Sequence, residues 1–434
     1  MDINTTGSEI VNPNNGAMQI NSNSIAAFVP TPIEKISILA SYAIAYLYTY
    51  ILFSPNGNTN ICLVIFTLCF CVGAELVYHK QKAIWESYIW LGCLLICLVC
   101  YVVGRDRIWG DYTLLFLHAY AIYWVLARSG RMMDKESSGF ILLDVINGVL
   151  IFPFKNFFLR FRVIWSSLKE KSKSNSSIVI KVITIIAVVF VVILFCLAVL
   201  LLSSADQLFG RAFYSVTKYL QVDIFREILI RFIISLPIGA YLYGLVIGTN
   251  REEPEKLLEH KNAVLNGLEY IKKVPSNIWT VLLGVFSVLY LIFFIFQGSY
   301  LFGAFAHKLP ETFTVAQYAR QGFFELCVIM ALNFILLWLA VMSSNTGIHR
   351  NKTLKVMCTV LLIESILFSV TALSKIFLYI SNFGFTPLRF QSTWLVCVLL
   401  VGCIASIYTI WTGRRSAKTW ILFSGITLAL LHIY

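Results

Sequence analysis

Residues 178–202 read IVIKVITIIAVVFVVILFCLAVLLL, and this run alone identifies the class of protein. A helix that crosses a bilayer needs about 20 apolar residues, and this run exceeds that length with one charge, Lys181, near its start. Similar apolar runs recur from Ile36 to Tyr434. The chain is 59% hydrophobic and 13% charged, a composition that no soluble globular class matches. The sequence therefore predicts an all-α, polytopic integral membrane protein.

The apolar runs divide into eleven predicted membrane spans, and they must be helical because hydrocarbon does not tolerate unpaired backbone groups. They cover residues 36–53, 61–77, 86–103, 112–127, 178–202, 228–247, 278–298, 323–342, 354–377, 392–411 and 418–434. Most of the 34 Lys and Arg residues fall in the N-terminal segment and the connections that would share its side of the membrane. The positive-inside rule therefore predicts a cytoplasmic N-terminus and an external C-terminus.

This division gives four regions. Residues 1–35 are rich in Asn, Ser, Thr and Pro and are expected to form a disordered cytoplasmic tail without a signal peptide. The first four spans occupy 36–127, a basic cytoplasmic segment occupies 128–177, and seven further spans occupy 178–434. The formal charge of +12 is spread over the cytoplasmic connections, which favours contact with anionic lipid headgroups and argues against nucleic-acid binding.

The segment 128–177 is predicted to contain interfacial helices. Residues 140–150 have helical spacing in an apolar stretch too short to span, and residues 155–171 interleave aromatic side chains with cations, as in a helix lying in the headgroup plane. A protein partner that binds this helix is the alternative. The polar and helix-ending residues singled out here are Asp144, Asn147 and Pro153. A second amphipathic helix is predicted at 255–271.

Ionisable residues inside a span are costly, about 2.5–3.5 kcal/mol on insertion scales, and therefore mark candidate sites. Glu364, Thr371 and Lys375 fall on nearly the same face of the predicted span 354–377. Two interpretations remain open. The stripe is either a buried relay or ion-binding path, or a structural hydrogen bond between helices made by a protonated Glu364.

Neither a catalytic motif nor a metal site is evident. The 11 cysteines all fall inside predicted spans, where they are expected to pack as small apolar residues. The motifs GxSxG, HExxH, GxxxxGK[ST] and GxGxxG do not occur. We therefore expect no enzyme activity, no metal and no cofactor.

Several strings resemble a known family. They are LDVINGVLIFPFKNFF (143–158), LLSSADQLF (201–209), LYLIFFIFQGSYLFGAF (289–305), QYARQGFFEL (317–326) and YISNFGFTPLRF (379–390). Together they are similar to a bacterial family of multi-pass membrane proteins catalogued as a domain of unknown function, of the 4173 or 4153 type. The resemblance covers roughly residues 140–434. It implies a location in the bacterial cytoplasmic membrane and carries no known activity.

These strings also place polar residues at the predicted outer ends of the helices. The residues are Asp206, Gln297, Tyr300, Tyr318, Arg320, Glu325 and Arg389. We expect Arg320 and Arg389 to pair with the acidic members or to hold an anionic ligand. The alternative is a clamp that ties the helix ends together.

The function predicted from these features is transport or ligand sensing across the membrane, without covalent catalysis. The alternative is a non-catalytic scaffold that regulates another membrane or signalling protein, and an intramembrane enzyme is the least supported class. A transporter should have a water-accessible cavity that reaches Glu364 from one side. A scaffold should confine its polar residues to surfaces.

Overall fold

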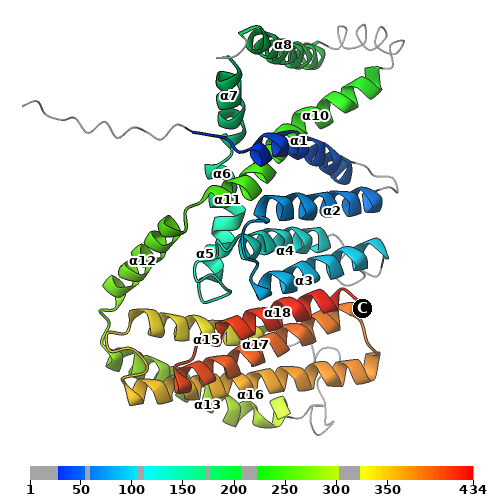
Figure 1. Ribbon diagram of the computed structural model, residues 1–434. Helices are drawn as coiled ribbons and strands as arrows, with labels where there is room; N and C mark the ends of the chain where they lie inside the picture. Colours follow the sequence, from blue (N-terminus) through cyan, green and yellow to red (C-terminus); the bar gives the residue numbers. More distant parts are fainter. Residues whose placement is uncertain are drawn as a thin grey trace, which may run out of the picture.

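The computed structural model describes residues 28–433 apart from 54–58, 105–111, 173–175, 207–221 and 303–322. The described residues form α-helices, two short π-helical segments and the turns between them, arranged as two helix bundles (Figure 1). The all-α prediction is therefore confirmed.

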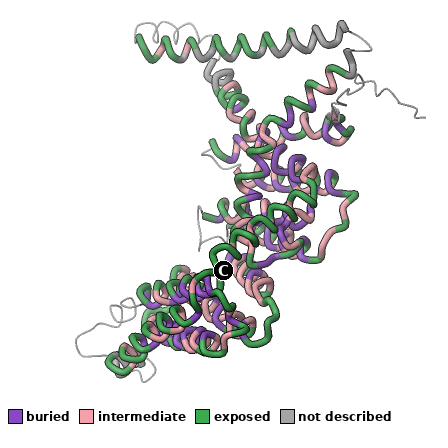
Figure 2. The backbone as a smooth tube through the Cα atoms, turned by 90° about the vertical axis from the view of Figure 1, so that its left-hand side faces the viewer, coloured by how far each residue is buried: buried purple, intermediate pink, exposed green. Residues whose placement is uncertain are grey.

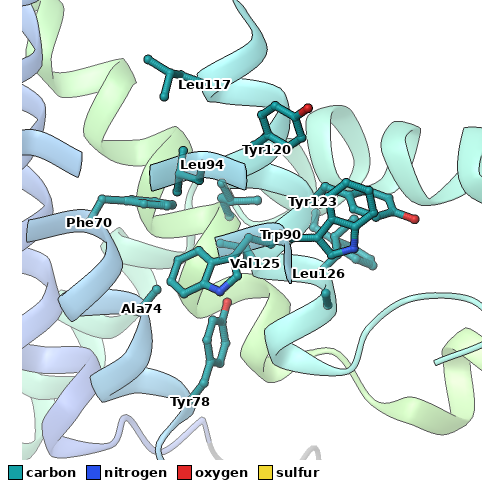
Figure 3. Close-up of a cluster of buried hydrophobic side chains, with 14 of the residues drawn as sticks. Phe70, Ala74, Tyr78, Trp90, Leu94, Leu117, Tyr120, Tyr123, Val125 and Leu126 are labelled. Carbon is teal, nitrogen blue, oxygen red and sulfur yellow. The ribbon is translucent and has the colours of Figure 1, made fainter. Parts of the chain in front are cut away.

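The first bundle contains the four N-terminal helices and a later helix that returns to them. These elements are α1 (Pro32–Phe53), α2 (Thr59–Tyr78), α3 (Trp85–Val102), α4 (Tyr112–Ser129), α10 (Val222–Tyr243), the π-helical η2 (Gly244–Gly248) and α11 (Thr249–Arg251). Helix α1 packs along α10 and α2, and α3 packs along α4. In the core of this bundle, Phe70 and Trp90 from α2 and α3 lie with Leu117, Tyr120 and Tyr123 from α4 (Figure 3).

The second bundle has a separate core. It contains α13 (Ser276–Phe302), α15 (Phe323–Ser343), α16 (Lys352–Phe383) and α17 (Pro387–Thr412). Helix α16 packs against all three of the others, so it is the central helix of this bundle.

Helix α18 (Ala417–Leu431) joins the two bundles, because it packs against α17 on one side and α3 on the other (Figure 1). Glycines make both contacts close. A Cβ at Gly425 would lie 2.4 Å from the ring of Trp90, and a Cβ at Gly402 of α17 would lie 2.9 Å from the ring of Trp420. The packing of α18 therefore depends on positions where only glycine fits.

The remaining elements connect or flank the bundles. They are α5 (Ile141–Ile146), the π-helical η1 (Asn147–Ile151), α6 (Phe152–Lys155), α7 (Leu159–Ser172), α8 (Ser176–Ala205) and α12 (Pro254–Ile271). Helices α5 and α7 run at a steep angle to α2–α4 (Figure 1). Helix α12 leads from the first bundle to the second on the side of the molecule where α5 lies (Figure 1). We call this the junction end; α2, α4, α15 and α17 finish there.

Nine helices among the described residues are long and apolar enough to cross a membrane. All but one coincide with predicted spans; the exception, Ile141–Lys169, combines α5 to α7 and was expected to be interfacial. Its length and composition qualify it as a span, although α5 lies beside the end of α4 and α7 leads away from it toward α8 (Figure 1). The predicted spans 112–127, 178–202 and 418–434 correspond to α4, α8 and the shorter α18.

The distribution of buried residues fits a lipid environment. Buried residues concentrate inside each bundle, and exposed residues follow the outer helix faces (Figure 2). Many exposed side chains are large and apolar, among them Leu39 at 77% and Leu76 at 62% exposure. Exposed apolar surface on this scale is unfavourable in water, so the molecule is a multi-pass membrane protein in a bilayer.

The π-helical η2 crosses α6, which directly follows η1 in the chain. A Cβ at Gly244 would lie 2.5 Å from the carbonyl oxygen of Pro153. Tyrosine hydroxyls satisfy carbonyls in both segments: Tyr78 donates to Val246 O at 2.9 Å, and Tyr241 donates to Val149 O at 3.1 Å. The two glycines of GLVIG, residues 244–248, thus permit a close crossing of helices, as small residues do in membranes.

Replacing Gly244 with alanine should destabilise the protein by about 1–3 kcal/mol, because the added methyl group overpacks the crossing. Gly267 in α12 is the matched control, since a Cβ there meets nothing within 4 Å. Gly267→Ala should leave stability unchanged or raise it by about 0.5–1 kcal/mol. Thermal unfolding midpoints of the purified variants test this, and equal midpoints for both variants would contradict the close crossing.

Candidate functional site

The loop between α4 and α5, residues 130–140, is held at the junction end by buried hydrogen bonds, and we call it the junction loop. Glu86, at the start of α3, is 2% exposed. Its carboxylate accepts the backbone N–H of Ser137, with N–O distances of 3.2 and 3.1 Å, and also the Ser137 hydroxyl. Trp90 Nε1 donates to the same carboxylate at 3.0 Å, and the Tyr123 hydroxyl lies 2.9 Å from Ser137 Oγ.

A second buried carboxylate holds the other part of this loop. Asp144 in α5 is fully buried, and its Oδ1 accepts the backbone N–H of Met133 at 2.8 Å. Its Oδ2 has no hydrogen-bond partner within the described part of the chain. Asn147 begins η1, and Pro153 lies in α6 beside η2. Of the three residues singled out from the sequence of this segment, Asp144 therefore contacts the junction loop, whereas Asn147 and Pro153 lie further along the chain in η1 and α6.

The junction loop carries charges that reach α12 and the second bundle. Asp134 forms an ion pair with Lys261 of α12 and lies 3.3 Å from Nη1 of Arg415, between α17 and α18. Lys418, at the start of α18, lies 2.5 Å from Glu136. Burial by itself raises the pKa of Asp134, but the hydrogen bonds from Lys261 and Ser138 and the charges of Lys261 and Arg415 together outweigh it and hold the pKa below its ordinary value. Asp134 is therefore ionised at neutral pH and attracts both cations.

A further ion pair fixes the ends of α2 and α4 beside this loop. Nε of Arg128 lies 2.9 Å from both carboxylate oxygens of Glu75, and its Nη1 donates to Gln81 O at 3.1 Å. Gln81 Nε2 donates to Asn250 Oδ1 of α11 at 2.6 Å. The junction end is thus a network of hydrogen bonds and ion pairs that connects α2, α3, α4, α11, α12 and α18. Sequence reasoning did not identify Glu86, Asp134 or Lys261 as members of a site.

The predicted stripe on α16 is buried in the second bundle. Glu364 is 7% exposed and faces Ser287 of α13, but Glu364 Oε2 and Ser287 Oγ have no hydrogen-bond partner of normal geometry among the described residues. A polar chain lies beside it: Tyr290 OH donates to Asn333 Oδ1, and Asn333 Nδ2 donates to Ser365 Oγ, both at 2.8 Å. This chain links α13, α15 and α16.

The other two stripe residues have different surroundings. Thr371 donates to Leu367 O one turn back, at 2.8 Å. Lys375 is fully buried, and the charge of Glu325 in α15 acts on it. The three residues share a helix face as predicted, but the described contacts do not connect them into one relay.

Arg389, from the predicted outer cluster, caps the end of α16. Its Nη1 donates to Phe383 O at 3.0 Å and to Gly384 O, and its guanidinium lies 4.0 Å from the centre of the Tyr379 ring. These carbonyls are free because α16 ends at Phe383. In the described residues this side chain therefore binds backbone oxygens and an aromatic ring.

The structure does not bring the rest of the predicted cluster together. Asp206 directly follows α8, which lies at the opposite end of the molecule from α15, α16 and α17, whereas Glu325 and Arg389 belong to those helices (Figures 1 and 2). Tyr318 and Arg320, and the side chains of Gln297 and Tyr300, lie outside the described residues. Pairing of Arg320 with Glu325 remains a prediction.

The cavities among the described residues include three that Glu364 does not line. One of about 430 Å³ lies between the bundles, and we call it the inter-bundle cavity. It is walled by α3, α4, α5, α17 and α18, and its aromatic residues are Trp90, Phe116, Tyr120, Tyr123, Trp394 and Trp420. Trp90 and Tyr123 also contact the junction network, so the cavity and the junction loop are adjacent.

A family model described as Domain of unknown function (DUF4153) matches residues 91–434. The match begins earlier than the resemblance over 140–434 indicated, and it includes most of α3 and all of α4. Neither the curated proteins nor the solved structures gave a match to this chain.

Asp134→Asn and Lys261→Gln should each lower the free energy of unfolding. The double variant should lose less free energy than the two single variants lose together, with a coupling of about 0.5–1 kcal/mol or more. Lys256→Gln is the control, because its pair with Glu253 is exposed and should contribute little. Chemical unfolding of the purified variants measures these free energies of unfolding. Additive losses at Asp134 and Lys261 would contradict a coupled pair.

The same pair should make stability depend on pH. The pKa of Asp134 is lower in the folded chain than its ordinary value of 3.8. Its contribution is therefore present at neutral pH and is lost as the pH falls through the folded-state pKa, below about 4. The stability difference between the wild type and Asp134→Asn should shrink in that acidic range, and a difference that grows there would contradict this assignment.

Proposed function

This chain belongs to the DUF4153 family, and from that premise we propose that it is a ligand sensor of the membrane that works without covalent catalysis. The observation that carries the proposal is the position of the junction loop. It is hydrogen-bonded to α3 and paired with both α12 and the α17–α18 connection. A ligand that alters the packing between the bundles therefore acts on this loop.

The charge pairs make the loop a sensitive reporter. Coulomb attraction falls with distance, so a small displacement of α12 or α18 weakens the pairs at Asp134 and Glu136. Helix α12 has no buried residue along its 18 residues, so packing does little to oppose such a displacement. A change in the packing between the bundles is thereby converted into a change in the order of the junction loop.

We also propose that eleven helices cross the membrane, with the N-terminus and the junction end cytoplasmic and the C-terminus external. The cations at the junction end support this orientation, because such residues favour the cytoplasmic side. They are Arg128, Arg131, Lys155, Lys261, Arg415 and Lys418. The exposed rings of Phe158, directly before α7, and of Phe161 and Trp165 on α7 support an interfacial helix that also contacts anionic headgroups. The resemblance favours the cytoplasmic membrane of a bacterium.

Transport is the second candidate function. Glu364 and Lys375 are buried inside a helix long enough to span, and intramembrane charges commonly mark the paths of ions or substrates. A scaffold that binds a protein partner through the aromatic side of α7 is the remaining alternative.

The two candidates predict different results in proteoliposomes. For a sensor, one member of a panel of amino acids, sugars, nucleosides and lipids should change hydrogen–deuterium exchange in residues 130–140 without net flux. The response should be lost in Lys261→Gln, which lacks the ion pair to Asp134. A flux that Glu364→Gln lowers would instead identify a transporter. Absence of any exchange response across the panel would refute sensing.

Orientation is tested by cysteine labelling in a variant without the native cysteines. His260→Cys in α12 should react with a membrane-impermeant thiol reagent only when the cytoplasmic face is accessible. Phe385→Cys, between α16 and α17, should react from the outside, since Phe385 is 47% exposed. The reverse pattern would overturn the orientation.

A further inference from the structure

We propose that the inter-bundle cavity binds one long acyl chain of a membrane lipid. This inference rests on the proposed sensor function, for which it names the class of ligand. The cavity volume, about 430 Å³, lies within the range of small-ligand sites in proteins. Its walls come from both bundles, so an occupant contacts both.

The chemistry of the walls selects an apolar ligand. The polar atoms of the aromatic side chains are already bound: Tyr120 OH donates to Gly425 O at 2.7 Å, and Trp394 Nε1 donates to Thr427 Oγ1 at 2.9 Å. Trp420 Nε1 donates to Val398 O at 2.9 Å. A polar ligand would lose its hydrogen bonds to water on entering and would find these donors occupied.

These side chains also keep the cavity open. Each Trp and Tyr ring is fixed at its polar tip by a hydrogen bond, and Trp90 in addition packs against the backbone at Gly425. Well-packed side chains fixed in this way do not collapse into a neighbouring void. Water would gain few hydrogen bonds in such an apolar space. A chain from the surrounding bilayer is therefore the occupant that fills it most favourably.

The position of the cavity in the membrane makes lipid acyl chains available to it. The cavity lies between helices that are embedded in the bilayer, so lipid tails are the apolar molecules at highest local concentration. A free fatty acid and a phospholipid share this chemistry, because each presents an acyl chain to the cavity and keeps its head group outside. The occupant contacts Trp90 and Tyr123, whose polar atoms are bound to Glu86 and Ser137 of the junction network. Occupancy is thereby transmitted to the junction loop.

Photolabelling of the full chain in lipid nanodiscs tests the site. A diazirine-bearing palmitic acid and a diazirine-bearing phosphatidylcholine form the two arms, and peptide mapping locates the label. Saturable labelling of α4 and α18 that oleic acid competes away is expected in at least one arm, and the arm that labels identifies the source.

Ala119→Phe should fill the cavity, because Ala119 lines it from α4 without belonging to either core. This variant should reduce saturable labelling of α4 and α18 about tenfold, which corresponds to about 1.4 kcal/mol in affinity. Val145→Trp on α5 should act in the same way, since Val145 also lines the cavity. Ala331→Phe, on the exposed side of α15, is the control and should label as the wild type does.

Two outcomes would overturn the site. One is labelling spread over the lipid-facing helices and insensitive to Ala119→Phe and Val145→Trp, which would mean bulk lipid only. The other is no saturable labelling in either arm. Lys261→Gln separates this inference from the sensor itself: it should keep the labelling and lose the exchange response at 130–140. Saturable labelling of the wild type without any change in hydrogen–deuterium exchange at 130–140 would support the lipid site and refute the sensor function.

Discussion

The buried carboxylate of Glu86 is the group on which the junction end depends. A carboxylate that is 2% exposed is tolerated only when it is well hydrogen-bonded, and Glu86 achieves this by accepting from Ser137 and Trp90. These bonds draw the loop over the end of α3, and that position brings Asp134 to Lys261. The ion pairs of the junction loop therefore lie beside one desolvated group, which itself lies 3.7 Å from Lys418 Nζ.

A second constraint comes from the bilayer, which requires every backbone group to be satisfied inside the protein. The π-helical segments depart from regular hydrogen bonding, and the hydroxyls of Tyr78 and Tyr241 satisfy carbonyls within them. Arg160 of α7 serves a similar purpose. It is 2% exposed, donates to Leu236 O at 2.6 Å and lies over the ring of Tyr42. Helix α7 is thereby anchored to α1 and α10, while its aromatic side stays exposed.

The sequence predicted the helices well because span length is set by the thickness of the bilayer, a property that each apolar run reveals by itself. It also singled out Asp144, Asn147 and Pro153 as interruptions of an apolar stretch. The expectation that the helix ends at Pro153 was wrong, because Pro153 lies in the first turn of α6, which continues to Lys155. Glu86 was missed because its partner Ser137 lies 51 residues away, and its position at the start of a span resembles an ordinary interfacial acid. Local spacing carries no information about such a pair.

The surroundings of the charged residues could not be predicted for a related reason. The sequence shows that Arg389 carries a charge, but it does not show that α16 ends at Phe383 and presents free carbonyls to it. The face shared by Glu364 and Lys375 was predictable from helical periodicity, whereas their neighbours on α13 and α15 depend on how the helices pack. Likewise, the division into two cores, and the cavity between them, arises only from tertiary packing.

The central claim is that occupancy between the bundles changes how they pack, and a distance measurement tests it most directly. Spin labels at Val72 on α2 and Ile335 on α15, both exposed, report the separation of the bundles by double electron–electron resonance in a variant without native cysteines. Oleic acid should shift and narrow the distance distribution in this protein and should have no effect when Ala119→Phe is added. Identical distributions with and without oleic acid in the protein that retains Ala119 would contradict the account.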